Sequence, residues 1–328
     1  MTVSSTPRVA AIIVNYRAAA LVKAHLPALM RELEPFPGSE IYIIDNASPG
    51  DDQEVLARFV DQEPYRSIVK FRPQSDNLGF GRGNNVALKE ILSDGERAPE
   101  FIYLLNPDAW PMPGSITQLF ECLRDRPDAG LAGPRLESEN GDIQPSAFRF
   151  FSIFGEFVNA SRNRVLRSLF KNLVIAPEPR DETYAVDWIC GAAVLIRREV
   201  FETVGLFDAN YFLYYEETDL MRRASNHGWE TWYVHNAGAV HHAGQSTGVI
   251  DGIGESQVSP DYWFQSRNYY FQTHHGVLGR FVADIGWLGG NLIYAARSVF
   301  SSAGAGHVLA NMRQFLKVGL SSSSTTRR

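Results

Sequence analysis

Short apolar runs alternate with helix-like segments through the first part of the chain, and this alternation constrains the fold more than any other feature. The apolar runs read as strands buried in a parallel sheet, because they are short and rich in Ile, Val, Leu and aromatic residues. They cover residues 9–14, 41–44, 68–71 and 101–105, with helical patterns at 18–33, 51–61 and 84–92. The pattern predicts an α/β fold, a Rossmann-like and mostly parallel sheet flanked by helices.

Polar residues follow the predicted strands where each strand ends. Asn15 ends the first strand, Asp45 the second, and Asn106 and Asp108 follow the fourth. In open α/β sheets ligands bind at this edge, and an acid there can hold a divalent metal against a phosphate. Asp45 can accept from a base or a ribose; alternatively, it only caps the next helix.

Composition and charge narrow the class of protein. The chain has 328 residues, 45% hydrophobic and 21% charged, so it can bury a sizeable core. Its formal net charge of −6 argues against broad nucleic-acid binding. Cys122 and Cys190 do not suggest a disulfide framework, and they favour a reducing cytoplasm.

The amino terminus has no signal-peptide pattern. The most apolar late segment, residues 281–300, is interrupted by Asp284 and Arg297 and does not resemble a membrane span. It is expected to be a helix packed on the core, with a membrane-surface helix as the alternative.

A glycine-rich stretch, residues 77–85, reads as a turn that leads into a helix. Glycines allow close approach of a ligand, and helix N-termini favour phosphate. The stretch lacks the Gly-x-Gly-x-x-Gly and P-loop patterns, so neither a dinucleotide site nor an ATPase is supported. Arg82 can pair with a diphosphate or be an ordinary exposed arginine.

Three carboxylates, Glu216, Glu217 and Asp219, lie within four positions and among aromatic residues. They either form an acidic first turn with an Asp219–Arg223 pair, or include a carboxylate of raised pKa that acts as a base. The aromatic surroundings favour the functional reading. His241 and His242 follow an apolar strand, and with Asp108 one of them can complete a metal site.

Several motifs in the same order resemble the inverting family 2 glycosyltransferases of GT-A fold, particularly the bacterial rhamnosyltransferase-like branch. The matching pieces span about residues 8 to 275. They are residues 14–17, 44–48, 77–80, 83–85, 105–108, 191–197, 204–208 and 212–220, with His241 and Arg267. Each piece is weak alone, and the combination is specific.

This resemblance implies roles for individual residues. Asp45 is similar to the acid that contacts the nucleotide. Asn106-Pro-Asp108 stands where the family has Asp-x-Asp, so Asp108 would bind Mg²⁺ or Mn²⁺ together with His241. Glu217 stands where the family usually has the aspartate base, which leaves Glu216 as an alternative base. The remaining expected substrate or nucleotide contacts are Asn15, Arg17, Asn77, Gly79, Arg82, Asn85, Asn106, Trp188, Asp219 and Arg267, the last beside the diphosphate.

The function expected from the resemblance is transfer of a sugar, with L-rhamnose from dTDP-L-rhamnose preferred, to a saccharide acceptor that is lipid-linked. UDP-galactofuranose and UDP- or GDP-hexoses remain alternative donors. A nucleotidyltransferase would carry a basic glycine-rich signature near its N-terminus, which residues 9–18 lack. A non-catalytic glycan-binding module would not need the acidic cluster.

The expected organisation is a catalytic domain over residues 1–255, a helical extension over 256–320 and a disordered tail over 321–328. Within the catalytic domain, residues 141–180 mix arginines with phenylalanines. This segment either contacts an acceptor or a membrane, or is an amphipathic helix that covers the sheet. The helical extension is a candidate for dimerisation or for peripheral contact with the inner face of the cell membrane.

Overall fold

The computed structural model describes residues 7–242, 258–298 and 306–322. Contacts divide the chain into two compact units. The sheet unit contains Met1–Phe148, Glu178–Ala209 and Glu216–Gly248. The helical unit contains Arg149–Pro177, Asn210–Tyr215 and Val249–Arg328, so the segment after Phe148 groups with the C-terminal helices.

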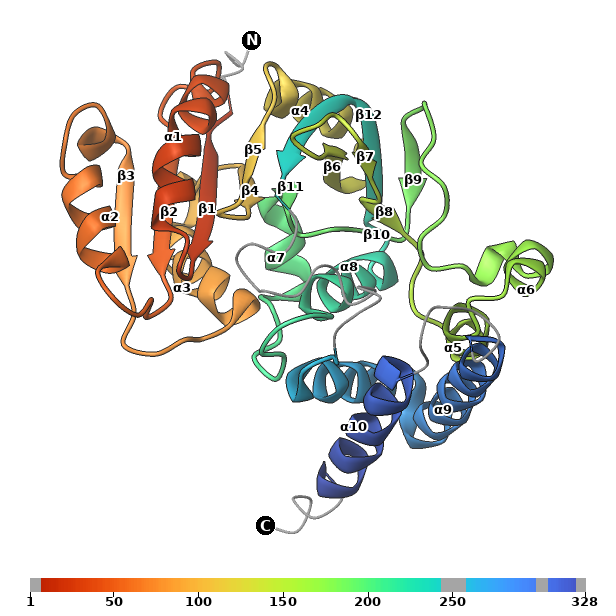
Figure 1. The fold of residues 1–328 in the computed structure, drawn as a ribbon. Helices are drawn as coiled ribbons and strands as arrows, with labels where there is room; N and C mark the ends of the chain where they lie inside the picture. The colour runs from red at the N-terminus through yellow and green to blue at the C-terminus, as the bar shows by residue number, and fades with distance from the viewer. Residues whose placement is uncertain (1–6, 243–257, 299–305, 323–328) are drawn as a thin grey trace. The chain divides into compact units, whose positions relative to one another are not determined.

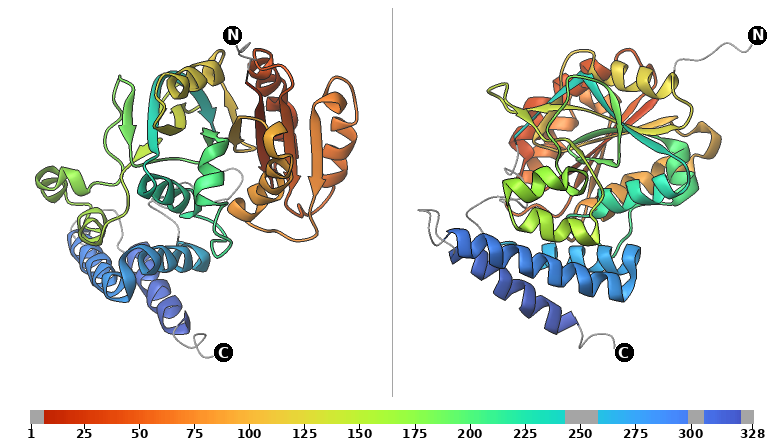
Figure 2. Two further views of the ribbon diagram at one scale, coloured as in Figure 1. Left: turned by 180° about the vertical axis from the view of Figure 1, so that it is seen from behind. Right: turned by 90° about the vertical axis from the view of Figure 1, so that its right-hand side faces the viewer.

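The sheet unit is built on one mixed sheet flanked by helices (Figures 1 and 2). Its strand order is β3-β2-β1-β4-β11-β6-β12-β5. The first four of these pair in parallel, and they are β1 (Val9–Asn15), β2 (Glu40–Asp45), β3 (Val69–Pro73) and β4 (Phe101–Leu105). The rest of this path is β5 (Ala109–Pro111), β6 (Ala129–Glu137), β11 (Ala193–Arg197) and β12 (Glu230–His241).

Short strands and the helices complete this unit. β7 (Ile143–Gln144) pairs with β6, β9 (Tyr184–Val186) with β12, and β8 (Ala147–Phe148) with β10 (Trp188–Ile189). The helices are α1 (Ala19–Leu33), α2 (Asp52–Val60), α3 (Phe80–Ser93), α4 (Ser115–Arg124), α7 (Arg198–Val204) and α8 (Glu216–Asn226), with 3₁₀ turns at Tyr65–Ser67 and Gly95–Arg97. The predicted α/β class, with its mostly parallel sheet, is confirmed.

The glycine-rich stretch differs from its prediction. It was expected to be a turn before a helix at Asn84, but α3 begins at Phe80, so Gly81 and Gly83 lie inside the helix. A Cβ atom at Gly83 would lie 2.8 Å from Cγ1 of Val14, and one at Gly81 would lie 3.1 Å from Cβ of Phe207. These glycines therefore let α3 pack closely on its neighbours.

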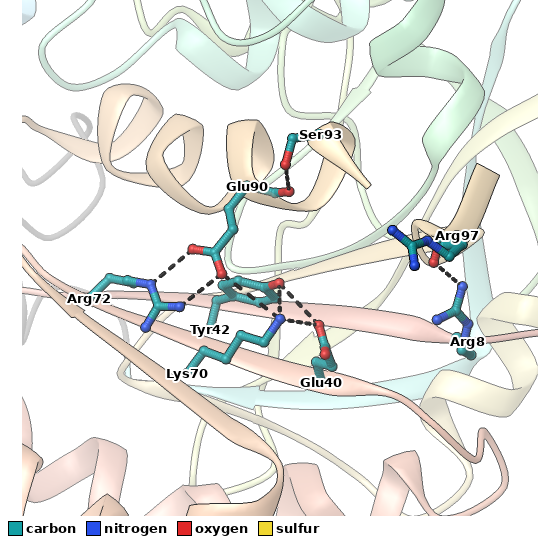
Figure 3. A network of polar contacts seen from close by, with 8 residues as sticks. All are labelled: Arg8, Glu40, Tyr42, Lys70, Arg72, Glu90, Ser93 and Arg97. Atoms are coloured by element: carbon teal, nitrogen blue, oxygen red, sulfur yellow. Dashed lines mark hydrogen bonds and ion pairs between the residues drawn. The ribbon is translucent and has the colours of Figure 1, made fainter. Parts of the chain in front are cut away.

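Charged residues hold α3 against the edge of the sheet (Figure 3). Arg72 of β3 donates two hydrogen bonds to Glu90 of α3, at 2.9 and 2.8 Å. Lys70 donates to Glu40 and to the hydroxyl of Tyr42, each at 2.8 Å. The Arg72–Glu90 contact thus holds α3 on β3, and the Lys70 contacts join β3 to β2.

The helical unit contains α5 (Ile153–Ala160), α6 (Arg164–Leu169), a 3₁₀ turn at Lys171–Leu173, α9 (Asp261–Ser298) and α10 (Gly306–Ser322). The predicted helical C-terminal region is confirmed. α9 breaks at Gly276, whose φ of 70° does not belong to a right-handed helix. Among the described residues, no helix is both long and apolar enough to cross a membrane. Of the tail expected to be disordered from residue 321, Ser321 and Ser322 belong to α10, and residues 323–328 lie outside the described residues.

Arg267 is the largest fully buried side chain of the chain's described part. Its guanidinium lies 2.6 Å from Glu156 of α5 and 2.6 Å from Asp284 of α9. It also lies over the rings of Phe271 and Phe315, at 4.8 and 5.4 Å from the ring centroids. The sequence expectation placed Arg267 beside a diphosphate; in the structure its charge is matched by two carboxylates inside the helical unit.

Replacing Arg267 by leucine should destabilise the helical unit by about 3–5 kcal/mol, because Glu156 would remain buried without its cationic partner. Urea unfolding of the full chain measures this loss. Arg280→Leu is the matched control, since Arg280 only approaches Asp284 at 3.7 Å near the surface and should cost less than about 1 kcal/mol. Equal losses for the two variants would contradict the structural role of Arg267.

Candidate functional site

The first two parallel strands bring Asn15 and Asp45 side by side at their carboxyl ends. The amide of Asn15 donates to one oxygen of Asp45 at 2.7 Å, and the N–H of Ser48 donates to the other at 3.0 Å. Both Asn15 and Asp45 are fully buried. The carboxylate of Asp45 is therefore held in one orientation at the edge where ligands bind in such sheets.

Strained backbone occurs at the same edge. Arg17, which follows β1, has φ of 59°, and Ala47, which follows β2, has φ of 58°. Residues with a side chain rarely adopt this region, and such strain concentrates at functional sites. Arg17 is exposed there, and its N–H donates to Ser48 at 2.9 Å, which ties the two loops together.

Asn46 follows Asp45 at the end of the second strand, and it organises the loop before α3, a role that the sequence did not predict. Its amide donates to the side chain of Asn77 at 3.2 Å and to the carbonyl of Gly79 at 2.9 Å. The side-chain oxygen of Asn46, Oδ1, accepts a hydrogen bond from the N–H of Leu78 at 3.2 Å. Gly79 has φ of 77°, which glycine adopts without strain. The signal was available, because Asn46 directly follows Asp45 at a strand end.

The two glutamates at the start of α8 face different neighbours. Glu216 is 1% exposed and packs on α3, since a Cβ atom at Gly81 would lie 3.4 Å from it. Glu217 is partly exposed and accepts a hydrogen bond from the N–H of Gly191. Among the described residues, one oxygen of each carboxylate, Oε2, has no hydrogen-bond partner.

Burial perturbs both carboxylates. It raises the pKa of Glu216 well above its usual range, and the charge of Glu217 raises it further. Burial also raises the pKa of Glu217, but the N–H groups of Glu217 and Gly191 oppose that rise. Glu217 is partly exposed and held by the N–H of Gly191, so its position is the better one for a base.

The chain enters α8 through an unusual turn. Tyr214 and Tyr215, the two residues before Glu216, have φ values of 68° and 71°. Two consecutive bulky residues in the left-handed region are rare and store strain. This turn sets the direction in which α8 begins. The sequence has no glycine at these positions, so it did not predict the turn.

Asp108 and His241 lie together, as the sequence analysis required of a metal site. Oδ1 of Asp108 is 3.5 Å from Nε2 of His241, and both residues are buried. The backbone supports this pair, because the N–H of His242 donates to the carbonyl of Asp108 at 2.9 Å. Within the described ranges, no group of three or more His, Cys, Asp or Glu side chains could hold a metal ion. A carboxylate and an imidazole fit a divalent cation whose other ligands come from outside this pair.

An aromatic and charged cluster lies beside this pair and was not expected from the sequence. The rings of His25 and Trp110 stack at 3.9 Å, and the ring of His242 lies 5.1 Å from Trp110. His242 also pairs with Glu139 at 2.9 Å. Burial lowers the pKa of His25, the nearby His242 lowers it further, and Glu139 and Asp108 oppose the effect.

Other expected site residues support the fold around the site. Asn85 makes two hydrogen bonds with the backbone of Phe207, at 2.8 and 3.1 Å. Asp219 pairs with Arg223 at 2.8 Å, and Arg223 in turn donates to backbone carbonyls before α8. Arg82 lies in α3, where its Nε donates to the carbonyl of Leu78 at 2.7 Å. Trp188 stacks on Phe148 at 4.4 Å.

A continuous set of contacts joins the candidate residues within the sheet unit. Asp45 and Asn46 hold the loop of Gly79, and α3 continues from that loop to Gly81 and Glu216. Glu217 binds Gly191, which precedes β11. β11 pairs with β4 at its carboxyl end, where the N–H of Asn106 donates to the carbonyl of Ala192 at 2.9 Å. Asp108 and His241 follow, so the nucleotide, base and metal candidates share one edge of the sheet.

Known proteins resemble this chain in sequence. A model of the family described as glycosyltransferase like family 2 matches residues 7–251. The N-acetylglucosaminyl-diphospho-decaprenol L-rhamnosyltransferase of Mycobacterium tuberculosis is 30% identical over 223 residues, which are 63% of this chain and 68% of that protein. The rhamnosyltransferase WbbL of Escherichia coli is 26% identical over 169 residues, 50% of this chain and 61% of that protein.

Solved structures share the fold at low identity. GalNAc-T7, solved with UDP, GalNAc and Mn²⁺, has a TM-score of 0.58 and 14% identity; the match covers 96% of this chain but only 55% of that one. The mannosyltransferase PcManGT from Pyrobaculum calidifontis, solved with GDP-Man and Mn²⁺, has a TM-score of 0.57 and 13% identity over 99% of this chain and 89% of that one. These neighbours show the GT-A fold, and the family match covers most of the chain. The chain belongs to glycosyltransferase like family 2.

Proposed function

We propose that this chain transfers L-rhamnose from dTDP-L-rhamnose, with inversion at the anomeric carbon, to a lipid-linked saccharide. Relatives named as rhamnosyltransferases support the sugar, and the M. tuberculosis relative, named for a decaprenyl diphosphate acceptor, supports the lipid-linked acceptor. The single observation that carries the chemistry is the position of Glu217. Its carboxylate is held by Gly191 at the sheet edge that also carries Asp45 and Asp108.

Each of these residues has a separate role in the proposed inverting transfer. Asp45, fixed by Asn15 and Ser48, orients the nucleotide. Glu217 accepts the proton of the acceptor hydroxyl as that oxygen attacks the anomeric carbon from the face opposite the leaving diphosphate. Such general base catalysis contributes about 10²–10⁴-fold to a rate. A single displacement of this kind inverts the anomeric centre.

Asp108 and His241 are the residues that would hold Mg²⁺ or Mn²⁺. A bound divalent cation supplies Lewis-acid stabilisation of the charge on the departing diphosphate. Two protein ligands leave most of the coordination sphere to other oxygens. We therefore expect firm metal binding only when the donor diphosphate is present.

A donor panel tests the proposal. The protein is incubated with dTDP-L-rhamnose, UDP-galactofuranose and UDP- and GDP-hexoses, with and without Mn²⁺ or Mg²⁺, and release of nucleoside diphosphate is measured. We expect binding and slow hydrolysis of dTDP-L-rhamnose, with inverted sugar on a prenyl-diphosphate-linked acceptor. Turnover of another donor instead would overturn the proposed donor sugar but not the proposed glycosyl transfer.

The same measurements distinguish a glycosyltransferase from a nucleotidyltransferase and from a glycan-binding module. A nucleotidyltransferase would release pyrophosphate from a sugar phosphate and a nucleoside triphosphate. A glycan-binding module would bind saccharide and turn over no donor. Either result would overturn the proposed transfer.

A further inference from the structure

The part of α9 after Gly276 exposes large apolar side chains and buries small or polar ones. Its outward side chains include five large apolar ones, which we call the α9 stripe: Val277, Leu278, Phe281, Ile285 and Leu292. They are 72, 75, 60, 55 and 56% exposed, respectively. The buried residues of the same segment are small or polar: Gly279, Ala283, Gly290, Asn291, Ala295 and Ser298. A helix that packs on a core in water normally shows the opposite arrangement.

Close packing against α5 explains the small residues on the buried face. A Cβ atom at Gly290 would lie 2.7 Å from the carbonyl oxygen of Phe157, and one at Gly279 would lie 3.1 Å from the side chain of Ile153. Small residues at a helix–helix contact, with large apolar residues facing outward, are typical of helices in contact with lipid. The α9 stripe thus has the composition of a surface that meets hydrocarbon.

Two further elements of the helical unit combine exposed apolar side chains with positive charge. In α10, Leu309 and Leu316 are exposed beside Arg313 and Lys317. In and after α6, exposed apolar residues lie among basic ones: Val165, Leu169 and Phe170 with Arg164, Arg167 and Lys171. Neither set contains an aspartate or a glutamate.

The charge of the helical unit decides between a membrane and a second copy of the chain. Among its described residues, ten arginines and lysines stand against three carboxylates, although the whole chain has a net charge of −6. Two of those carboxylates, Glu156 and Asp284, are paired with Arg267. Two like-charged surfaces repel each other, whereas an anionic lipid surface attracts basic residues by about 1 kcal/mol each.

We propose that the helical unit docks on the surface of an anionic phospholipid bilayer through the α9 stripe, with the basic residues of α6 and α10 contacting the headgroups. The described helices do not qualify as membrane spans, so α9 would lie in the interface rather than cross it. This inference does not depend on the identity of the sugar or of the acceptor.

Co-sedimentation of the full chain with vesicles tests the docking. Phosphatidylcholine vesicles are compared with vesicles that also contain phosphatidylglycerol, at low and high salt. We expect binding to the anionic vesicles, weakened by salt. The double variant Phe281→Ser/Ile285→Ser should bind at least about tenfold more weakly, because it removes apolar area from the interface. Arg313→Gln with Lys317→Gln should weaken binding by about fivefold per charge.

Ile143→Ser is the matched control, since Ile143 is a 49% exposed apolar residue of the sheet unit and should leave vesicle binding unchanged. Thermal melts check that each variant folds, and Leu278→Ser replaces the double variant if that one does not. Failure of the parent chain to bind anionic vesicles would overturn the proposal. So would an equal loss in the Ile143 control, or a dimer in analytical ultracentrifugation that the stripe variants dissociate while vesicles remain unbound.

Discussion

Replacing Glu217 by glutamine is expected to lower transfer by about 10²–10⁴-fold while donor affinity changes little. The amide keeps the size of the carboxylate and can still accept the hydrogen bond from Gly191, but it cannot take a proton. Single-turnover transfer and calorimetric donor binding separate these two effects. Glu199→Gln, an exposed glutamate of α7, is the matched control and should leave both unchanged.

The neighbouring acid provides the decisive comparison. Glu216 is almost completely buried and burial raises its pKa well above the usual range, whereas Glu217 is partly exposed, so Glu216 is the less accessible of the two to an acceptor hydroxyl. Glu216→Gln should therefore cost less than Glu217→Gln. Near-normal turnover of Glu217→Gln, together with a large loss in Glu216→Gln, would move the base role to Glu216.

The pH dependence of the transfer rate follows from the same burial. A base works only when ionised, and burial raises the pKa of Glu217. The rate should therefore rise with pH along an acidic limb that lies above the ordinary titration range of glutamate. A pH profile of kcat/KM measures that limb, and the limb should be absent from the residual activity of Glu217→Gln. A limb in the ordinary range would contradict the raised pKa of Glu217.

Replacing Asp108 by alanine is expected to abolish the metal-dependent part of donor binding. Without Asp108 the cation would lose a protein ligand that holds it against the diphosphate, so donor affinity in Mn²⁺ should fall by about two orders of magnitude, or about 2.7 kcal/mol. His241, 3.5 Å from Asp108, would then be the one protein ligand left of the proposed pair. Calorimetry with and without Mn²⁺ measures the difference.

Two comparisons make the Asp108 experiment specific. Asp125→Ala removes an exposed carboxylate at the end of α4 and should leave the metal effect intact. His241→Gln should reduce the metal effect without changing donor binding in the absence of metal. Donor affinity that responds to Mn²⁺ equally in the parent and in Asp108→Ala would remove Asp108 from the metal site.

Local sequence patterns were sufficient for the four parallel strands β1 to β4 and for the helices α1 and α2. The runs at residues 9–14, 41–44 and 101–105 are short and apolar, and β1, β2 and β4 occupy them. The start of α3 was not predictable in this way. Glycines weaken a helix in isolation, and only contacts with Val14 and Phe207, distant in sequence, explain why Gly81 and Gly83 stand inside one.

The candidate site shows the same division. Asp45, Asp108 and Glu217 were identifiable because strand ends and an acidic helix start leave a local signal. The roles of Asn46, Tyr214 and Tyr215 were not predicted, since they lie in hydrogen bonds to a distant loop and in backbone conformation.

The sequence by itself determined the α/β class, the order of the motifs and the acids that a glycosyl transfer requires. The α/β class follows from short-range periodicity and the candidate acids from local residue chemistry, whereas their roles in glycosyl transfer are implied by the resemblance to the family. Only the tertiary structure decided which acids are free to act. It paired Arg267 with Glu156, 111 residues away in the sequence, and it left Glu217 on Gly191 at the sheet edge. The physical reason is that burial and charge pairing depend on residues far apart in the chain, which no local pattern contains.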